Sequence, residues 1–316
     1  MEFDDIRQVA MVGAGTMGSG MALCFAQAGY GVHLYSVTAK RLEWALTRIR
    51  SSQALFVQEG LVSAEAAEAA RQRIAVTTDL AQAIAGAQFV LETAPENLEL
   101  KQQLFRDIEA LCPADVILAT NTSGLSITAI ASACQHPERV GGMHWANPAE
   151  IVPLVEVNRG EKTSQHTIDL IYQVAERLGK VPVRVNKDIP GFASNRLQYA
   201  LLREALHLVA EGVVSPEDVD RTLKCGVGFR YPWLGPLETV DLGGVDVFNS
   251  VARYLFKALS NSTDTTVLER LVAEGRLGIK SGRGFYDYQQ SSAEEILRQR
   301  DLYFIRQLKL LRAMRQ

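Results

Sequence analysis

Cysteine is scarce in this sequence, and the few thiols lie far apart. The 316 residues include four cysteines with no Cys-x-x-Cys pair: Cys24, Cys112, Cys134 and Cys225. That spacing fits neither a disulfide scaffold nor a zinc site. We therefore expect reduced thiols, a cytoplasmic location and no bound metal.

Excess charge and long apolar runs are absent as well. The formal net charge is −3, which argues against binding to nucleic acids or to anionic membranes. No apolar run approaches the ~20 residues needed to span a bilayer. The chain begins with the acidic sequence Met-Glu-Phe-Asp-Asp, so we expect no signal or transit peptide. Hydrophobic residues make up 47% of the chain, which is ordinary for a globular protein, and its length predicts about two domains.

A glycine-rich turn lies near the start of the chain. Apolar residues 6–12 lead into Gly13-Ala14-Gly15-Thr16-Met17-Gly18, and a helical pattern follows as far as Ala28. In Gly-x-Gly-x-x-Gly the first glycine permits a tight turn, the second admits a pyrophosphate, and the third lets helix and strand pack closely. The helix N-terminus then offers free N–H groups to the phosphates. We therefore expect dinucleotide binding at Gly13, Gly15, Thr16, Met17 and Gly18.

The second expected strand, 31–35, is not followed by the acidic residue that usually binds the adenosine ribose. Ser36 takes that place, and Lys40 and Arg41 follow. Loss of the acid removes the repulsion that excludes a 2′-phosphate, and Arg41 would be near one. Because Lys40 and Arg41 can equally be solvated residues in the first turn of a helix, NAD and NADP both stay open.

Strands and helices alternate over the first part of the chain and give way to helices alone. Strands are expected at 6–12, 31–35, 74–77, 88–92, 116–119, 140–145, 151–157 and 181–185, and helices between them at 40–58, 64–72, 79–85, 97–111 and 163–178. Later helices are expected at 194–211, 216–225, 245–260, 267–275 and 293–314. We predict an α/β fold: a Rossmann-type doubly wound, mostly parallel sheet domain at 1–187 and an all-helical domain at 188–316, with a tail from about residue 289.

Polar loops follow two of the predicted strands. Residues 92–97 and 120–124 lie where such strands end, and ligands of doubly wound sheets bind at the carboxyl ends of the strands. Taken alone, each loop can equally serve to cap a helix, with Asn97 and Ser126 as ordinary N-cap residues.

The stretch 140–157 holds two apolar runs separated by the turn signal Asn147-Pro148. His144 lies in the first run and Glu156 in the second, so a hairpin-like return would bring an imidazole and a carboxylate together. A histidine oriented by a carboxylate is a general base near neutral pH. The alternative is a core histidine with a satisfied hydrogen bond, and this stretch alone leaves both open.

Several separate motifs, in the right order, resemble the 3-hydroxyacyl-CoA dehydrogenase family over at least residues 6–288. Besides the glycine turn, they are Pro95-Glu96-Asn97 with Lys101, Asn121-Thr122-Ser123, His144 with Asn147-Pro148, Leu154-Val155-Glu156, Pro190-Gly191-Phe192 with Asn195-Arg196, and Gly282-Arg283-Gly284-Phe285-Tyr286.

The resemblance implies a role for each matching residue. His144 would be the general base and Glu156 its orienting partner, while Ser123 and Asn195 would hydrogen-bond the reacting oxygen. Glu96, Lys101 and Asn121 would lie along the nicotinamide-ribose side of the cofactor, and Ala94 and Ser123 would also bind the cofactor. NAD as the cofactor, a place in fatty acid metabolism and a homodimer formed through the C-terminal domain are also implied by the family.

Other features are similar to the λ-crystallin, or L-gulonate 3-dehydrogenase, branch of this family. They include Leu197-Gln198-Tyr199-Ala200 and Pro153 before Leu154. CoA-using members carry lysines near the end of the helix that follows the second strand. This chain has Phe56-Val57-Gln58-Glu59-Gly60-Leu61 there, and Glu59 would repel a polyanionic handle.

We expect a nicotinamide-dependent oxidoreductase that converts an L-3-hydroxyacyl-CoA or a related L-3-hydroxy acid to the 3-oxo compound by hydride transfer. One alternative is a dehydrogenase of free 3-hydroxy acids, L-gulonate-like or L-carnitine-like. Another is a non-catalytic dinucleotide-binding or structural protein. The C-terminal helices carry more apolar residues than one thin domain can bury, which also favours a homodimer.

Overall fold

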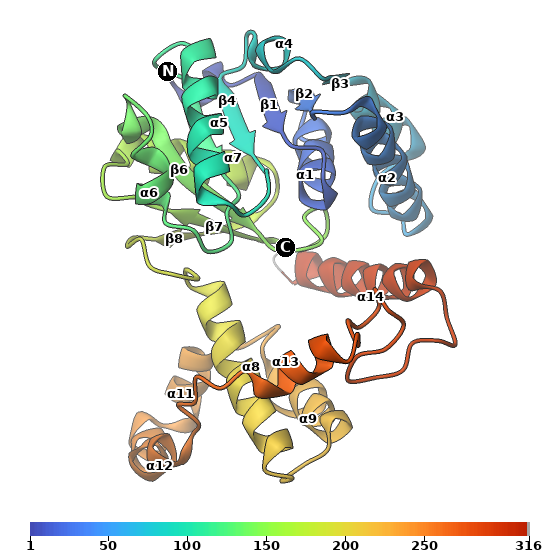
Figure 1. The fold of residues 1–316 in the computed structure, drawn as a ribbon, viewed down its shortest axis with the longest axis vertical. Helices are drawn as coiled ribbons and strands as arrows, with labels where there is room; N and C mark the ends of the chain where they lie inside the picture. Colours follow the sequence, from blue (N-terminus) through green and yellow to red (C-terminus); the bar gives the residue numbers. More distant parts are fainter. Residues whose placement is uncertain (315–316) are drawn as a thin grey trace. The chain divides into compact units, whose positions relative to one another are not determined.

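The computed structural model describes residues 1–314, which form two compact units (Figure 1). The first unit comprises Met1–Arg196 together with Asp301–Met314, and the second comprises Leu197–Arg300. Within the described residues, no helix combines the length and apolar character needed to cross a membrane.

The first unit is built on one eight-stranded sheet in the order β3-β2-β1-β4-β5-β6-β7-β8. All neighbouring strands are parallel except β6 and β7, which are antiparallel. This confirms the predicted doubly wound, mostly parallel sheet. The strands are β1 (Gln8–Val12), β2 (Gly31–Tyr35), β3 (Ile74–Thr77), β4 (Phe89–Glu92), β5 (Ile117–Thr120), β6 (Val140–Trp145), β7 (Leu154–Asn158) and β8 (Val181–Val185).

Helices cover both faces of this sheet, so its central strands are apolar on both sides. On one face Val9 and Met11 of β1 join a core with α1 and α7, and on the other Ala10 and Val12 join a core with α5 and α6. The elements between the strands are η1 (Phe3–Asp5), α1 (Thr16–Gln27), α2 (Ala39–Gln58), α3 (Ala64–Gln72), α4 (Leu80–Ile84), α5 (Leu98–Leu111), α6 (Ile127–Ala131), η2 (Pro137–Arg139) and α7 (Gln165–Arg177).

The sequence-based boundaries agree with the structure to within about two residues at most ends, with one clear exception. The strand expected at 151–157 begins only at Leu154. The backbone N–H groups of Ile151 and Val152 both donate to the carbonyl of Pro148, so these two residues belong to the turn. The helices α6 and, later in the chain, α11 (Pro236–Gly243) were not expected as elements, although Ser126, the N-cap residue of α6, was expected as a cap.

The second unit consists mainly of helices. They are α8 (Ser194–Ala210), which begins in the first unit, α9 (Pro216–Thr222), η3 (Leu223–Val227), α10 (Gly228–Arg230), α11 (Pro236–Gly243), α12 (Val245–Ala258), α13 (Thr266–Ala273) and the start of α14 (Ala293–Ala313). The helix expected at 216–225 changes to a π-helical turn after Thr222. In the glycine-rich segment 278–288, Tyr286 donates its hydroxyl proton to Asp220 at 2.9 Å.

The C-terminal part of α14 packs on the first unit. Leu302, Ile305 and Leu308 are buried, and the last two join the core that contains α1. The ammonium of Lys309 lies 3.1 Å from a carboxylate oxygen of Glu59, the C-cap residue of α2. The C-terminal part of α14 therefore belongs to the first unit and covers its core.

Candidate active site

The carboxyl ends of four neighbouring strands lie level with one another. In the parallel register Val12 of β1 pairs with Glu92 of β4, Glu92 with Thr120 of β5, and Thr120 with Gly142 of β6. The loops after β1, β4 and β5 and the end of β6 therefore meet at one edge, where doubly wound sheets bind their ligands. Most of the predicted site residues lie at this edge.

His144 and Glu156 face each other across the antiparallel pair of β6 and β7. Nδ1 of His144 lies 2.7 Å from Oε2 of Glu156, and both side chains are buried. The predicted hairpin contact is therefore present. Phe192, which is fully buried, places its ring 5.8 Å from the imidazole between centroids and shields it.

The Glu156 carboxylate is held by four hydrogen bonds. Oε2 accepts from His144 and from the Ser194 hydroxyl, and Oε1 accepts from the backbone N–H groups of Ala193 and Ser194. Burial alone would raise the pKa of Glu156, but the bonds from His144 and Ser194 outweigh it and lower the pKa to about 2. Glu156 is therefore a stable anion that fixes the orientation of the imidazole.

The glycine turn has the geometry that a bound pyrophosphate needs. Gly13 has a φ of 123°, which is strained for any other residue, and a Cβ on Gly18 would lie 1.8 Å from the Gly13 carbonyl oxygen. Open space surrounds the Cα of Gly15. Gly15 is also the N-cap residue of α1, and no side-chain cap bonds to the first N–H groups of this helix. Those N–H groups belong to Thr16 and Met17. These residues fit the phosphates of a dinucleotide.

Ser36 and Arg41 lie near the expected position of the adenosine end of the cofactor. Ser36 directly follows β2 and is buried, and its N–H donates to the carbonyl of Thr77 at 3.3 Å. Arg41 is exposed in the first turn of α2, where its guanidinium stacks on Trp44 at 5.2 Å from the ring centroid. The structure therefore shows Arg41 as a solvated first-turn residue that rests on its own helix.

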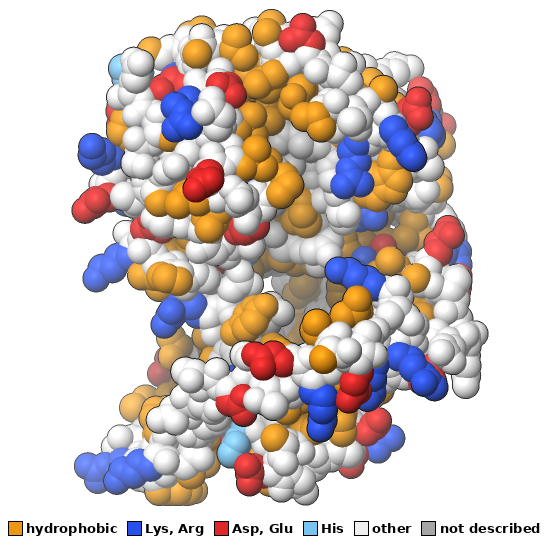
Figure 2. All heavy atoms as spheres, in the orientation of Figure 1, with side chains coloured by type: hydrophobic (Ala, Val, Ile, Leu, Met, Phe, Trp, Pro, Cys, Tyr) orange, Lys and Arg blue, Asp and Glu red, His pale blue; other side chains and the backbone are white. Residues whose placement is uncertain are grey.

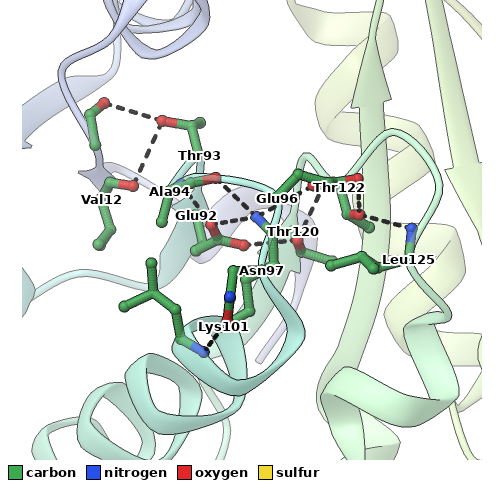
Figure 3. A network of polar contacts seen from close by, with 12 residues as sticks. Val12, Glu92, Thr93, Ala94, Glu96, Asn97, Lys101, Thr120, Thr122 and Leu125 are labelled. Atoms are coloured by element: carbon green, nitrogen blue, oxygen red, sulfur yellow. Dashed lines mark hydrogen bonds and ion pairs between the residues drawn. The ribbon is translucent and has the colours of Figure 1, made fainter.

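A buried ion pair supports the loop after β4. Figure 3 shows dashed lines from Glu92 and Ala94 converging on the ammonium of Lys101. Lys101 Nζ lies 2.6 Å from Glu92 Oε1 and 3.0 Å from the Ala94 carbonyl, and both charged side chains are almost fully buried. The other carboxylate oxygen of Glu92 accepts from Thr120 at 2.6 Å. Glu92 therefore joins β4, β5, α5 and the loop.

Glu96 organises the neighbouring loop from its more exposed position. Its Oε1 accepts from the Thr122 hydroxyl, from the Ser123 hydroxyl and backbone, and from the Gly124 backbone at 2.7–3.1 Å. Burial raises the pKa of Glu96, but these bonds and the Lys101 charge outweigh it, so its pKa lies below the ordinary value. The Lys101 ammonium lies 3.8 Å from Oε2 of Glu96, so its charge also acts on this carboxylate.

Ser123, Asn121 and Asn195 are also brought to this edge. The Asn195 side-chain amide donates to the carbonyl of Ser123 at 2.8 Å, and Oδ1 of Asn121 accepts from the backbone N–H of Trp145 at 2.9 Å. Asn121 thereby ties the loop after β5 to the strand that carries His144. The Ser123 hydroxyl now bonds to Glu96, so a substrate would have to compete for it.

Three residues at the site carry roles that sequence reasoning did not assign: Glu92, Phe192 and Ser194. Glu92 is a carboxylate at the end of an otherwise apolar strand, and this position could have marked it as a site residue. Phe192 belongs to the motif Pro190-Gly191-Phe192, but its contact with His144 depends on a φ of 50° that no pattern predicts. Within residues 1–314, no group of three or more His, Cys, Asp and Glu side chains is placed to hold a metal.

Comparison with known proteins identifies two matching family models. The NAD-binding domain of 3-hydroxyacyl-CoA dehydrogenases matches residues 8–189, and the C-terminal domain of the same enzymes matches residues 191–288. Together they cover most of the chain and leave the tail unmatched.

Three similar proteins differ in how much of the chain they cover. The 5-formyl-3-hydroxy-2-methylpyridine 4-carboxylate 5-dehydrogenase of Mesorhizobium japonicum is 38% identical over 96% of this chain and 98% of its own. A crystal structure under that enzyme name, described as an NAD+-dependent dismutase, has a TM-score of 0.90 at 36% identity, covering 97% of this chain and 99% of that one. A probable 3-hydroxybutyryl-CoA dehydrogenase of Bacillus subtilis is 38% identical over 92% of this chain and 100% of its own. A λ-crystallin homolog of Bos taurus is 38% identical over 78% and 77%.

Proposed function

The chain belongs to the 3-hydroxyacyl-CoA dehydrogenase family, and on that premise we propose that it oxidises a small free hydroxy acid with His144 as the general base. It is an NAD-dependent oxidoreductase that acts on CH–OH groups. The observation that carries the proposal is the buried contact of 2.7 Å between His144 and Glu156 at the ligand-binding edge of the sheet.

The proposed chemistry follows from the tautomer that this contact favours. With Nδ1–H donating to the Glu156 anion, Nε2 of His144 is the free acceptor that takes the substrate hydroxyl proton. NAD held at the glycine turn would supply the acceptor for the hydride that leaves the carbon bearing this hydroxyl. The C–H and O–H bonds break, a C=O bond forms, and Glu156 stabilises the resulting imidazolium. In the reverse direction His144 returns the proton.

Ser123 and Asn195 are proposed to steady the reacting oxygen. Both lie at the same edge and are already linked, because the Asn195 amide holds the carbonyl of Ser123. A hydrogen bond from either side chain would be strongest when the oxygen carries most negative charge, which is the condition for lowering the barrier. Glu96 and Lys101 are proposed to bind the ribose hydroxyls on the nicotinamide side.

The end of α2 supports a substrate without a CoA handle. Glu59 places a carboxylate where CoA-using members carry lysines, and its cation partner, Lys309, comes from α14. The alignment with the Mesorhizobium enzyme, named for a free pyridine carboxylate, covers 96% of this chain. The Bacillus relative, named for a CoA thioester, is aligned over 92% of this chain. A hydrated aldehyde presents the same CH–OH group, so the same loss of a proton and a hydride would convert it to a carboxylic acid.

A CoA thioester is the second candidate, because several relatives are named as 3-hydroxybutyryl-CoA dehydrogenases. That substrate would place the enzyme in fatty acid metabolism. Initial rates decide between the two: acetoacetyl-CoA with NADH or NADPH, against L-gulonate, L-carnitine and a formylpyridine carboxylate with NAD or NADP. We expect turnover of a free acid or aldehyde and little of the thioester. Fast turnover of the thioester alone would establish the second candidate.

A histidine variant separates catalysis from mere cofactor binding. His144→Ala should lower turnover by ~10²–10⁴-fold while NAD affinity stays close to that of the wild type. His136→Ala, which changes an exposed histidine paired with Glu138, is the matched control and should keep full activity. Equal turnover in His144→Ala and the wild type would refute the assigned base and favour a non-catalytic dinucleotide-binding protein.

We also propose a homodimer formed through the second unit. Many large apolar side chains on its helices are more than half exposed: Leu197, Tyr199, Leu237, Leu242, Val245, Val247, Tyr254 and Phe256. Figure 2 shows orange side chains at the lower left, where α11 and α12 lie in Figure 1. Apolar surface on this scale is usually covered by another subunit.

The proposed location is the cytoplasm. The four cysteines are free thiols, and Cys24 is buried in the core. Burial raises the pKa of Cys24, which keeps this thiol protonated and unreactive. These features support a reducing compartment.

A further inference from the structure

The Glu156 carboxylate oxygen that holds the imidazole is shared with a second side-chain donor. Oε2 accepts from Nδ1 of His144 at 2.7 Å and from the hydroxyl of Ser194 at 2.6 Å. Oε1 accepts from the backbone N–H groups of Ala193 and Ser194 at 2.9 and 2.8 Å. Four donors fill the acceptor capacity of a carboxylate that is only 1% exposed.

Ser194 cannot easily move away from this oxygen, because its segment is fixed on both sides. Upstream, the Asp188 carboxylate accepts from the Ser126 hydroxyl and from the N–H groups of Ile127 and Thr128 at 2.6–3.2 Å. Between these anchors, Gly191 and Phe192 have φ values of 77° and 50°, which turn the chain sharply. Downstream, the next residue, Asn195, is bound to Ser123.

We propose that Ser194 is a positioning residue whose hydroxyl shares Oε2 of Glu156 with His144 and thereby limits how strongly the carboxylate holds the protonated imidazole. This inference rests on the proposed function, in which His144 must give up its proton for each new oxidation. A hydroxyl that donates to a carboxylate oxygen stabilises the anion and so lowers the affinity of the carboxylate for a proton. Without that donor, Oε2 binds the imidazolium more tightly.

The effect of the Ser194 hydroxyl on the His144–Glu156 pair can be measured in a pH profile, because few ionisable groups contact Glu156. Among the described residues, His144 on β6 is the ionisable side chain that bonds to Glu156. On the other side β8 places Val183 opposite Glu156, and α8 and its approach contribute only Ser194 and backbone N–H groups. The acid limb of oxidation therefore reports the protonation of the His144–Glu156 pair as a unit.

The same carboxylate also fixes the start of α8. Glu156 takes two of the N–H groups at that end, and the residue that follows them is Asn195, which is proposed to contact the reacting oxygen. Ser194 therefore joins the base and the oxygen-binding amide through one carboxylate. Loss of the hydroxyl leaves both N–H bonds in place, so the helix start should be retained.

The test compares Ser194→Ala with Ser194→Thr, which keeps a hydroxyl, and with Ser164→Ala. Ser164 caps α7 by accepting from the N–H of Thr167, so its removal is a matched loss of a serine at a helix start. The measurement is kcat/KM for oxidation and reduction across pH 5–10. In Ser194→Ala we expect the acid limb of oxidation to move up by on the order of one pH unit, with the reductive direction less affected at neutral pH. Ser194→Thr and Ser164→Ala should keep the wild-type profile.

A second readout needs no substrate. Imidazole NMR of His144, assigned by its loss in His144→Ala, should show a higher titration midpoint in Ser194→Ala than in the wild type. Unchanged midpoint and unchanged acid limb in Ser194→Ala, or a rate loss equal at all pH values, would overturn the role of Ser194. If His144→Ala kept full turnover while the midpoint still moved, the proposed function would fail and the shared-oxygen contact would stand.

Discussion

At the scale of single residues, Glu156 links the active-site geometry to stability. Its pKa of about 2 is well below the ordinary value of 4.5, so folding favours the anion. A lowered carboxyl pKa stabilises the fold above the unfolded pKa, and this contribution disappears as the pH falls toward the folded pKa. The shift corresponds to roughly 3 kcal/mol for a fully buried group.

We therefore predict a specific loss of stability in acid. Urea unfolding of the wild type should show the free energy of unfolding falling between about pH 4.5 and 2, in the window set by Glu156. Glu156→Gln should be less stable at neutral pH and should show a flatter dependence in this window. Equal slopes for the two proteins would contradict the assigned hydrogen-bond origin of the shift.

The limits of sequence reasoning at this scale are visible in the same cluster. His144 and Glu156 could be paired from the sequence, because two strands and a turn fix which residues face each other. Ser194 and Phe192 could not be added, because their contacts depend on two consecutive positive φ values at Gly191 and Phe192. Ser123 and Asn195 were expected near the reacting oxygen, and their contact with each other was not foreseen.

At the scale of elements, the Glu92–Lys101 pair decides whether the loop after β4 keeps its shape. Each side chain is 1% exposed or less, and the two charges compensate each other at a distance of 2.6 Å. Removing one member of such a pair leaves the other charge buried without compensation, which typically costs ~3–5 kcal/mol of stability. An exposed pair is worth much less, about 0–1 kcal/mol.

A double-mutant cycle tests this difference. Lys101→Met should destabilise the protein by ~3–5 kcal/mol and weaken NAD binding, because the loop that carries Glu96 loses its support. Adding Glu92→Gln should recover part of the lost stability. The control, Lys309→Met, removes a partly exposed partner of Glu59 and should cost under about 1 kcal/mol. Additive effects of the two core changes, measured by urea unfolding, would show that the charges are not coupled.

Most elements of the first unit could be predicted because their patterns are local. Apolar strands end at Val12, Glu92 and Thr120, and helices begin after residues that cap them, such as Asn97 and Ser126. The start of β7 was placed three residues too early, since Ile151 and Val152 are as apolar as a strand yet bond within the turn to Pro148. Hydrophobicity alone does not show which backbone N–H groups already form hydrogen bonds within a turn.

At the scale of the whole molecule, the last helix, α14, shows which contacts a sequence pattern cannot predict. The sequence predicts a helix at the end of the chain, and its side chains Leu302, Ile305 and Leu308 are buried within the first unit. The ion pair between Lys309 and Glu59 joins residues 250 positions apart, which no local pattern can anticipate. The family assignment came instead from the order of several separate motifs.

The exposed apolar helices of the second unit give the last prediction. A side chain such as Leu237 or Leu242, at 78% and 74% exposure, gains free energy when a partner covers it, about 25 cal/mol per Å² of apolar surface. We predict a dimer by light scattering at micromolar concentration. Leu237→Asp with Leu242→Asp should give a monomer, because each carboxylate would have to be desolvated in the interface. Leu111→Asp, at an exposed site in the first unit, should stay dimeric. A wild-type monomer, or a dimer that survives both changes, would mean that these helices are covered in another way.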